Sequence, residues 1–166
     1  MASKSQKGFT LIELLVVIAI IGLLSTLAVV ALNSARQKSR DSKRVADIKQ
    51  MQTALELYFA DKNGYPVQGS PVAITLGSTT DKVLCDGGLA TGFQDLSTSC
   101  AAANPTIYMG LVPAAPQPVD GTCTSGQNDY SYSSAAATSY NINFCLGGIV
   151  GNLQGGVHNA TPNGMQ

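Results

Sequence analysis

A long apolar segment lies near the N-terminus. From Leu14 to Ala35 the chain has 22 consecutive residues without a charge, and most of them are apolar. As an α-helix with a rise of ~1.5 Å per residue, this segment would be ~33 Å long, which is close to the thickness of the hydrocarbon core of a bilayer. The pattern therefore predicts one membrane-spanning helix. A secretory signal peptide is the alternative, but its apolar core usually has only about 7 to 15 residues.

The predicted helix continues beyond the apolar segment. Residues 10 to 63 include no proline and their only glycine is Gly22, so no residue type forces a helix to end there. Asn63-Gly64, followed by Pro66, predicts its end, because glycine accepts the left-handed cap and proline cannot continue the hydrogen-bond ladder. After Arg36 the apolar side chains recur every three or four residues, which is typical of a helix with one buried face. These apolar positions are Val45, Ile48, Met51, Leu55 and Tyr58.

Beyond Tyr65 the chain is rich in Gly, Pro and small polar residues, with short strand-like runs. Tyr140–Leu146 alternates apolar and polar residues with a period of two, which predicts a half-buried strand. Asp129–Ser133 alternates similarly, and the segment SAAATS between the two runs predicts a hairpin connection. Leu111–Val112 and Ile149–Val150 are weaker strand candidates. We therefore expect an α+β fold, in which the second half of the long helix packs on a small antiparallel sheet.

Four cysteines follow the apolar segment: Cys85, Cys100, Cys123 and Cys145. No two of them form the C-x-x-C pair that a zinc ribbon or a thioredoxin site needs, so disulfides are favoured over a metal site. Three pairings are open, and we favour the two local ones, Cys85 with Cys100 and Cys123 with Cys145. Disulfides imply that the C-terminal part lies in an oxidising exterior. We expect no metal and no cofactor.

The charges are unevenly distributed, although the formal net charge is zero. Eight of the ten Lys and Arg residues lie at or before Lys49, and the chain after Lys82 has four Asp and no Lys or Arg. More bases follow the apolar segment than precede it, so the positive-inside rule alone predicts the opposite orientation to the one that the disulfides favour. The bases that follow it are Arg36, Lys38, Arg40, Lys43, Arg44 and Lys49.

This basic cluster has two interpretations. It could bind DNA or anionic lipid, or it could be a solvated helix face that contacts the acidic heads of neighbouring copies. No aromatic residue lies between Arg36 and Lys49 to stack on bases, which favours the solvated face. DNA binding therefore stays an unsupported alternative.

No arrangement of residues indicates catalysis. His158 is the only histidine, and it lies in a Gly- and Asn-rich segment that we interpret as a solvated tail. No nucleophile, base and orienting acid occur together in a known motif. Residues 61 to 64, DKNG, resemble the start of a calcium loop, but Pro66 stands where an EF-hand needs its turn glycine. We therefore expect a protein that is not an enzyme.

Glu13 is the only charged residue between Gly8 and Arg36. With Thr10 it forms a T-x-x-E capping box in front of the apolar run, and an acid also suits the positive end of the helix dipole. A carboxylate in hydrocarbon costs ~2.5 kcal/mol or more unless it is paired with a cation. Cleavage after Gly8 would supply that cation as the new amine of Phe9. Between identical copies stacked with an axial offset, this pairing would set their register.

The basic leader, Gly8, Phe9, the TLI tripeptide, Glu13 and the apolar run together resemble the class III signal of type IV pilins and of the related pseudopilins. The resemblance covers residues 1 to 66, and it implies that a prepilin peptidase cleaves between Gly8 and Phe9 and methylates the Phe9 amine. It also implies that processed copies polymerise through their apolar helices, with Glu13 setting the register. Many type IV pilins have a proline within the apolar helix, whereas this chain has none before Pro66.

The predicted organisation has four segments. Residues 1–8 are a leader peptide that is removed, 9–35 the transmembrane and filament-core half of the helix, 36–64 its amphipathic half, and 65–166 a β-rich globular head with disulfide loops. We expect a structural subunit of a type IV pilus or pilus-like filament. A pseudopilin of a type II secretion or competence system is the alternative within the family. A membrane-anchored extracytoplasmic binding module is the alternative from another class.

The expected partners follow from the resemblance. They are other copies of the chain in a helical homopolymer, the prepilin peptidase, the pilus assembly machinery, and the inner membrane before assembly. The precursor is expected to cross that membrane once with its head outside. After assembly the subunit is expected in an extracellular pilus or a periplasmic pseudopilus.

Overall fold

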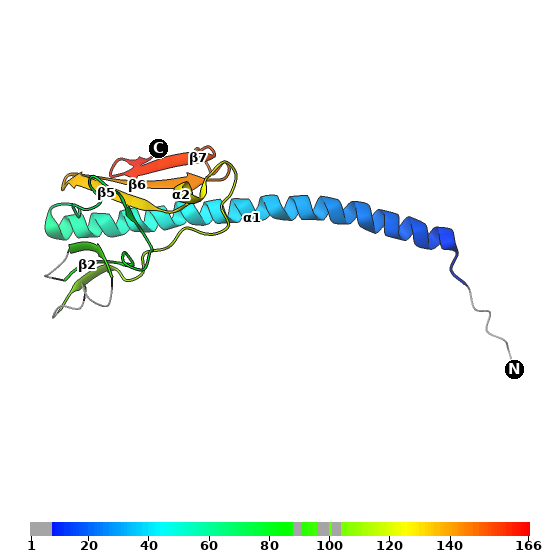
Figure 1. Ribbon diagram of the computed structural model, residues 1–166, viewed down its shortest axis with the longest axis horizontal. Coiled ribbons are helices and arrows are strands. Elements are labelled where there is room, and N and C mark those ends of the chain that lie inside the picture. The colour runs from blue at the N-terminus through cyan, green and yellow to red at the C-terminus, as the bar shows by residue number, and fades with distance from the viewer. Residues whose placement is uncertain (1–7, 88–90, 96–99, 101–103) are drawn as a thin grey trace. The chain divides into compact units, whose positions relative to one another are not determined.

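The structure is a computed structural model that describes residues 8–87, 91–95, 100 and 104–166 (Figure 1). The expected leader, residues 1–8, therefore lies outside the described residues apart from Gly8. The chain divides into two compact units, which we name the N-terminal unit, Met1–Arg36, and the C-terminal unit, Gln37–Gln166. Helix α1 contributes to both units, and all the strands belong to the second.

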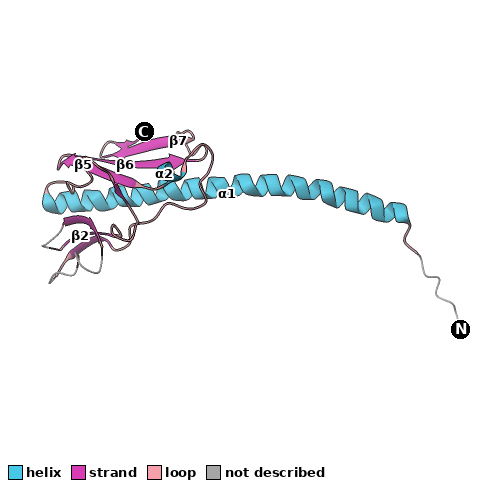
Figure 2. Cartoon of the chain, in the orientation of Figure 1, coloured by secondary structure: helices cyan, strands magenta, loops and turns pink. Residues whose placement is uncertain are grey.

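Helix α1, Leu11–Lys62, is one helix of 52 residues, as the lack of proline predicted (Figure 2). Its end differs from the expectation. Asn63 and not Gly64 takes the left-handed conformation, with a φ of 55°, and the Asn63 N–H donates to the Phe59 carbonyl over 2.7 Å. Asparagine tolerates this conformation better than most residues with a side chain. Gly64 is needed for a close approach instead, because a Cβ on it would lie 2.9 Å from the Ala137 Cβ.

A five-stranded antiparallel sheet has the order β1-β5-β6-β7-β8. Its strands are β1 (Ile74–Thr75), β5 (Ser131–Ala136), β6 (Ser139–Leu146), β7 (Gly156–Thr161) and β8 (Gly164–Met165). β6 contains the predicted strand Tyr140–Leu146. Its alternation is confirmed, because the exposed fractions of Tyr140, Ile142 and Phe144 are 4%, 0% and 0% while the asparagines between them are half-buried.

The predicted β5–β6 hairpin is confirmed, but its connection is shorter than expected. Of the segment SAAATS, only Ala137 and Thr138 lie between the two strands. Next to this turn the strand pairing is irregular, and the Ser134 hydroxyl donates to the carbonyls of Ala136 and Ser139, over 3.0 and 2.8 Å. This hydroxyl satisfies backbone groups that a regular ladder would pair. The run of small residues in SAAATS does not indicate these hydroxyl–carbonyl hydrogen bonds.

A second antiparallel sheet has the order β3-β2-β4 and was not predicted. Its strands are β2 (Val83–Asp86), β3 (Thr91–Gln94) and β4 (Thr106–Met109). The candidate Leu111–Val112 is not a strand, since it follows β4 and the Val112 N–H donates to the Lys82 carbonyl over 2.6 Å. The candidate Ile149–Val150 is not one either, because Val150 forms only an isolated bridge with Leu153. A four-residue helix, α2 (Ser125–Asn128), precedes β5.

The amphipathic half of α1 lies between the two sheets (Figures 1 and 2). Ile48, Met51 and Leu55 have no exposed surface. They belong to the same core as Leu84 of β2 and Ile142 of β6. The predicted packing of this half on an antiparallel sheet is therefore confirmed, and the second sheet covers a further part of the helix.

Each of the two disulfides has one of its cysteines in a strand. Cys85 of β2 pairs with Cys100, and Cys145 of β6 pairs with Cys123 just before α2. These are the two local pairs favoured from the sequence. Together with the helix and the sheets they confirm the expected α+β fold with disulfides.

Ile142 tests the position of the core. In the oxidised fragment 37–166, we expect Ile142→Ala to lower the free energy of unfolding by about 2–5 kcal/mol, because the shortened side chain leaves a cavity. Urea denaturation followed by circular dichroism measures this difference. Ile149 is 64% exposed, so Ile149→Ala should change the same quantity by less than about 0.5 kcal/mol. Equal effects of the two substitutions would contradict the described packing.

Candidate functional site

The first turn of α1 carries the predicted capping box. The Glu13 carboxylate accepts the Thr10 backbone N–H over 2.8 Å and the Thr10 hydroxyl over 2.6 Å. In return the Glu13 N–H donates to the Thr10 hydroxyl oxygen over 3.3 Å. The expected capping box is confirmed, and it holds the carboxylate in a fixed place at the start of the apolar helix.

Glu13 and Phe9 lie beside the same shallow groove. Its volume is about 340 Å³, and four of its five lining side chains are apolar. The lining residues are Phe9, Ile12, Glu13, Val16 and Val17. The groove thus joins an apolar surface to one carboxylate. Gly8 directly precedes Phe9 in the chain, and a Cβ added to Gly8 would have no atom of another segment within 4 Å. Such a groove suits a cation that is carried on an apolar chain.

The apolar half of α1 is exposed on all sides. Every residue from Leu11 to Ala35 is exposed, including large side chains such as Leu23 and Leu27, which are 63% and 62% exposed. A helix that is apolar all round has to be covered by lipid or by other protein. In the described part of the chain, α1 is the one helix that is long and apolar enough to cross a membrane.

Two hydroxyl residues of this apolar half, Ser25 and Thr26, are satisfied within the helix. Ser25 donates to the Ile21 carbonyl over 2.7 Å, and Thr26 donates to the Leu23 carbonyl over 2.8 Å. Both side chains therefore bring no unpaired polar group into an apolar environment.

In the C-terminal unit, the basic cluster differs from the expected solvated face. Arg44 has no exposed surface. Its guanidinium group donates to Asp41 over 2.7 Å and to Asp120 over 3.2 Å. It also bonds the Asn128 side chain over 2.7 Å and the Pro116 carbonyl over 3.0 Å.

Arg40 joins the same network through Asp120, so neither Arg40 nor Arg44 belongs to a solvated face. The interpretation was wrong for these two because their partner Asp120 is distant in sequence. The exposed bases of the cluster are Arg36, Lys38, Lys43 and Lys49.

Asp41 connects this network to the end of β6. Its two carboxylate oxygens accept the N–H groups of Gly147 and Gly148, each over 2.9 Å. The approach is close, because a Cβ on Gly147 would lie 2.4 Å from the Asp120 Cβ. The network therefore fastens both the end of β6 and the segment around Asp120 to α1.

Two carboxyl groups of the C-terminal unit have shifted pKa values. The hydrogen bond from Arg40 holds the pKa of Asp120 below its usual value, against the opposing effect of burial. Burial raises the pKa of Asp47, and the hydrogen bond that its carboxylate accepts from the Tyr130 hydroxyl over 3.0 Å only partly offsets this effect. Ion pairing thus favours the charged form of Asp120, whereas burial disfavours that of Asp47.

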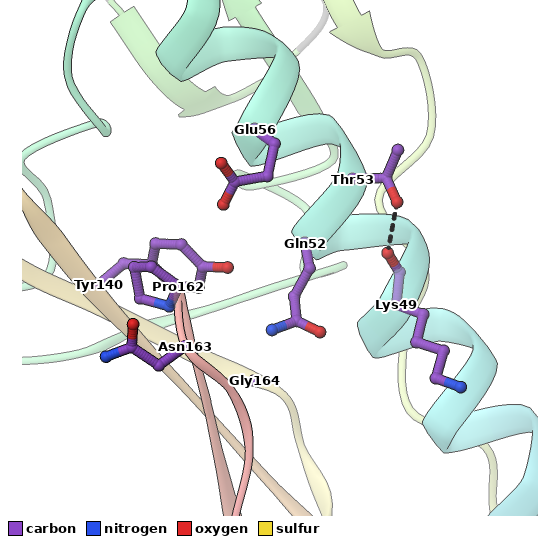
Figure 3. Close-up of a pocket in the computed structure, with 8 residues that line it drawn as sticks. All are labelled: Lys49, Gln52, Thr53, Glu56, Tyr140, Pro162, Asn163 and Gly164. Atoms are coloured by element: carbon purple, nitrogen blue, oxygen red, sulfur yellow. Dashed lines mark hydrogen bonds between the residues drawn. The ribbon is translucent and has the colours of Figure 1, made fainter.

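A polar groove of about 470 Å³ lies between α1 and the turn that joins β7 to β8 (Figure 3). Burial raises the pKa of Tyr140 at its base to about 12. The Glu56 carboxylate accepts the Tyr65 hydroxyl over 2.8 Å. The groove therefore offers polar contacts without a nucleophile placed beside a base. Its lining residues are Lys49, Gln52, Thr53, Glu56, Tyr140, Pro162, Asn163 and Gly164.

His158 is not in a tail. It lies in β7, half-buried, with its ring centroid 5.5 Å from that of Phe144. Its two ring nitrogens lie 3.0 and 2.7 Å from the carbonyl oxygens of Gln166 and Gln154. The strand was missed because its glycine, asparagine and threonine residues show no apolar alternation.

The N-terminal segment matches the family model described as the prokaryotic N-terminal methylation motif, over residues 3–29. This match confirms the resemblance to type IV pilins and pseudopilins. No solved structure matches the chain.

Three relatives illustrate the similarity. The chain is 42% identical over 66 residues to type II secretion system core protein G of Aeromonas hydrophila, which covers 40% of this chain and 46% of that protein. It is 43% identical over 65 residues to the core protein G of Escherichia coli, covering 39% and 45%. It is 32% identical over 102 residues to the type IV major fimbrial protein FimA of Dichelobacter nodosus, covering 61% of each. The chain thus spans about half the length of the core G proteins that it matches.

Acidification tests the Asp120 network. Because the folded pKa of Asp120 is depressed, its ion pairs stabilise the fold fully above the unfolded pKa of about 3.9 and are lost as pH falls through the folded value. We expect Asp120→Asn to lower the free energy of unfolding of fragment 37–166 at pH 7 by on the order of 3 kcal/mol, since buried Arg44 loses a counter-ion.

The same variant should lose less stability than the parent fragment on acidification below about pH 4, as measured by urea denaturation at several pH values. Asp129 is exposed, and Asp129→Asn is the matched control, with stability and acid response close to those of the parent. An unchanged acid response in Asp120→Asn would contradict the assigned role of the network.

Proposed function

We propose that this protein is a structural subunit of a type IV pilus or pilus-like filament, made as a membrane-anchored precursor and assembled through α1. One observation carries the proposal. A prepilin-type methylation motif stands at residues 3–29, at the start of a helix that exposes apolar side chains on every side, and Phe9 and Glu13 line one groove there.

The proposed first step is cleavage between Gly8 and Phe9 by a prepilin peptidase. The new Phe9 amine is then methylated and stays a cation. Glu13 already accepts two hydrogen bonds from Thr10, so its carboxylate is oriented before any partner arrives. In the assembled filament, the amine of a neighbouring copy enters the groove beside Glu13, where low polarity strengthens the attraction between the two charges.

Pairing at Glu13 matters more here than it would in water. In a bilayer the apolar surface of α1 is already covered by lipid chains, so the hydrophobic effect gives little reason for helices to associate. Close packing and the one charged group in the apolar half then decide whether and in which register copies join. Glu13 therefore adds to packing a specificity of register that Leu and Ile side chains cannot supply.

The disulfides favour an exterior location for the C-terminal unit. We give them more weight than the excess of Lys and Arg that follows the apolar segment, because a helix that is drawn into a filament spans the membrane only temporarily. We propose a precursor that crosses the inner membrane once and later becomes part of an extracellular filament.

A pseudopilin of a type II secretion or competence system is the second candidate. It is favoured by the similarity to core protein G of Aeromonas hydrophila and Escherichia coli, whereas the fimbrial FimA shares a larger part of its length with this chain. Filaments sheared from the cell surface would support the pilus. Subunits found only in a periplasmic assembly, together with loss of secretion on deletion of the gene, would support the pseudopilus.

N-terminal processing is the first test. We expect intact-mass analysis of the protein from its native host to give a chain that begins at Phe9 and is heavier by one methyl group. Fragmentation should place that methyl group on the Phe9 amine. A chain that begins at Met1, or within the apolar segment, would leave an anchored or secreted module in place of the filament subunit.

Substitution of Glu13 is the second test. We expect Glu13→Gln to reduce sheared filaments by about 100-fold, because an amine buried without its partner costs at least about 3 kcal/mol. Filament protein is quantified against the membrane-bound pool. Glu56 is exposed and lies in the C-terminal unit, so Glu56→Gln is the isosteric control and should assemble normally. Normal assembly of Glu13→Gln would overturn the pairing.

A further inference from the structure

Two lysines of the C-terminal unit converge on one groove although they are distant in sequence. We name it the basic groove, and its volume is about 390 Å³. Lys43 comes from α1 and Lys82 directly precedes β2, and both are exposed. Among the described residues neither lysine makes an ion pair. The lining residues are Lys43, Gly77, Lys82, Leu111, Val112, Pro113 and Ala114.

Besides the two lysines, the lining of the basic groove includes Leu111 and Gly77. Leu111 is 75% exposed and lines the groove together with the two lysines. Gly77 has a φ of 70° and lets the Ala114 backbone come close, because a Cβ on Gly77 would lie 2.7 Å from the Ala114 Cα. The groove therefore presents two ammonium groups beside an apolar side chain, which suits a partner with carboxylate and apolar groups together.

The same unit carries a surface of the opposite kind near the end of α1. Leu57 is 56% exposed, and Asp61 lies one helical turn further on, so the two side chains are neighbours on one helix face. We name this pair the acidic patch. Asp61 accepts the Tyr108 hydroxyl over 2.6 Å, which fixes its carboxylate without neutralising it. The neighbouring base, Lys62, is already paired with Asp86.

We propose that the basic groove of one copy binds the acidic patch of a second copy, an inference that rests on the proposed filament function. Two features match independently: the ammonium groups of Lys43 and Lys82 with the Asp61 carboxylate, and exposed Leu111 with exposed Leu57. A free phosphate or a lipid headgroup would use only the charges. The contact is heterologous, and between parallel copies displaced along α1 it does not close on itself, so it joins the copies into an open series.

The proposed contact has a defined axial spacing. Lys43 and Asp61 are 18 residues apart on α1, which corresponds to ~27 Å along the helix. Parallel copies joined in this way are displaced by about that distance. Phe9 and Glu13 are only ~6 Å apart along the chain direction at the same rise. Copies joined by a Phe9–Glu13 pair are therefore displaced by only about that distance. The two contacts therefore join one copy to two different neighbours.

Charge reversal with rescue tests this pairing. In the full chain expressed in its native host, we expect Lys43→Glu with Lys82→Glu to reduce sheared filaments by about tenfold relative to the membrane-bound pool, because attraction becomes repulsion. Asp61→Lys alone should give a similar loss. All three substitutions combined should restore filaments to within about twofold of the wild type, since opposite charges again face each other.

The control is Lys49→Glu, an exposed lysine of α1 outside the basic groove, which should assemble like the wild type. An unchanged membrane pool with both disulfides formed confirms that the variants fold. The proposal is overturned if the double lysine variant assembles normally, or if adding Asp61→Lys gives no rescue. Failure of the proposed function looks different, because the wild-type chain itself would then form no filament.

Discussion

The C-terminal unit is organised around the buried guanidinium group of Arg44. This group bonds a carboxylate on its own helix, a carboxylate 76 residues later, and the Pro116 and Asn128 oxygens. Withdrawing such an ion from water is costly, so most of its hydrogen bonds have to be made. The ion pairs and hydrogen bonds of this network therefore hold the segment around Asp120 and the end of β6 against α1. Burial of the apolar core stabilises the same arrangement.

A second constraint acts on α1, which has to suit two different surroundings. Its C-terminal half buries one face between two sheets and leaves the other face polar. Its N-terminal half has no polar face, and the hydroxyls of Ser25 and Thr26 are turned back to the helix backbone. Glu13 is the only charged residue of this half, so charge-based recognition of a partner by that half has to start from one carboxylate.

The sequence predicted the elements whose patterns are regular and local. The helix, its buried positions Ile48 to Tyr58, the alternating strand β6 and the capping box at Thr10 follow from spacing within one element. The second sheet did not, because β2 buries three successive residues, Val83 to Cys85, and β4 has no clear alternation. The Arg44 network could not be predicted, since Asp41 at i−3 suggests only a surface pair and nothing local indicates Asp120. Of the candidate site, Gly8, Phe9 and Glu13 came from one contiguous motif, whereas the basic groove joins residues that only the fold brings together.

The basic groove and the acidic patch share no residue, and this has a consequence for any assembly that uses them. Each added copy occupies one surface of its neighbour and offers the other, so every internal copy is satisfied on both sides. The terminal copies are not. One end of such an assembly displays vacant lysine grooves and the other displays vacant carboxylates, which gives the assembly a chemical polarity. A protein that starts, anchors or caps it could recognise one end from the sign of its charge alone.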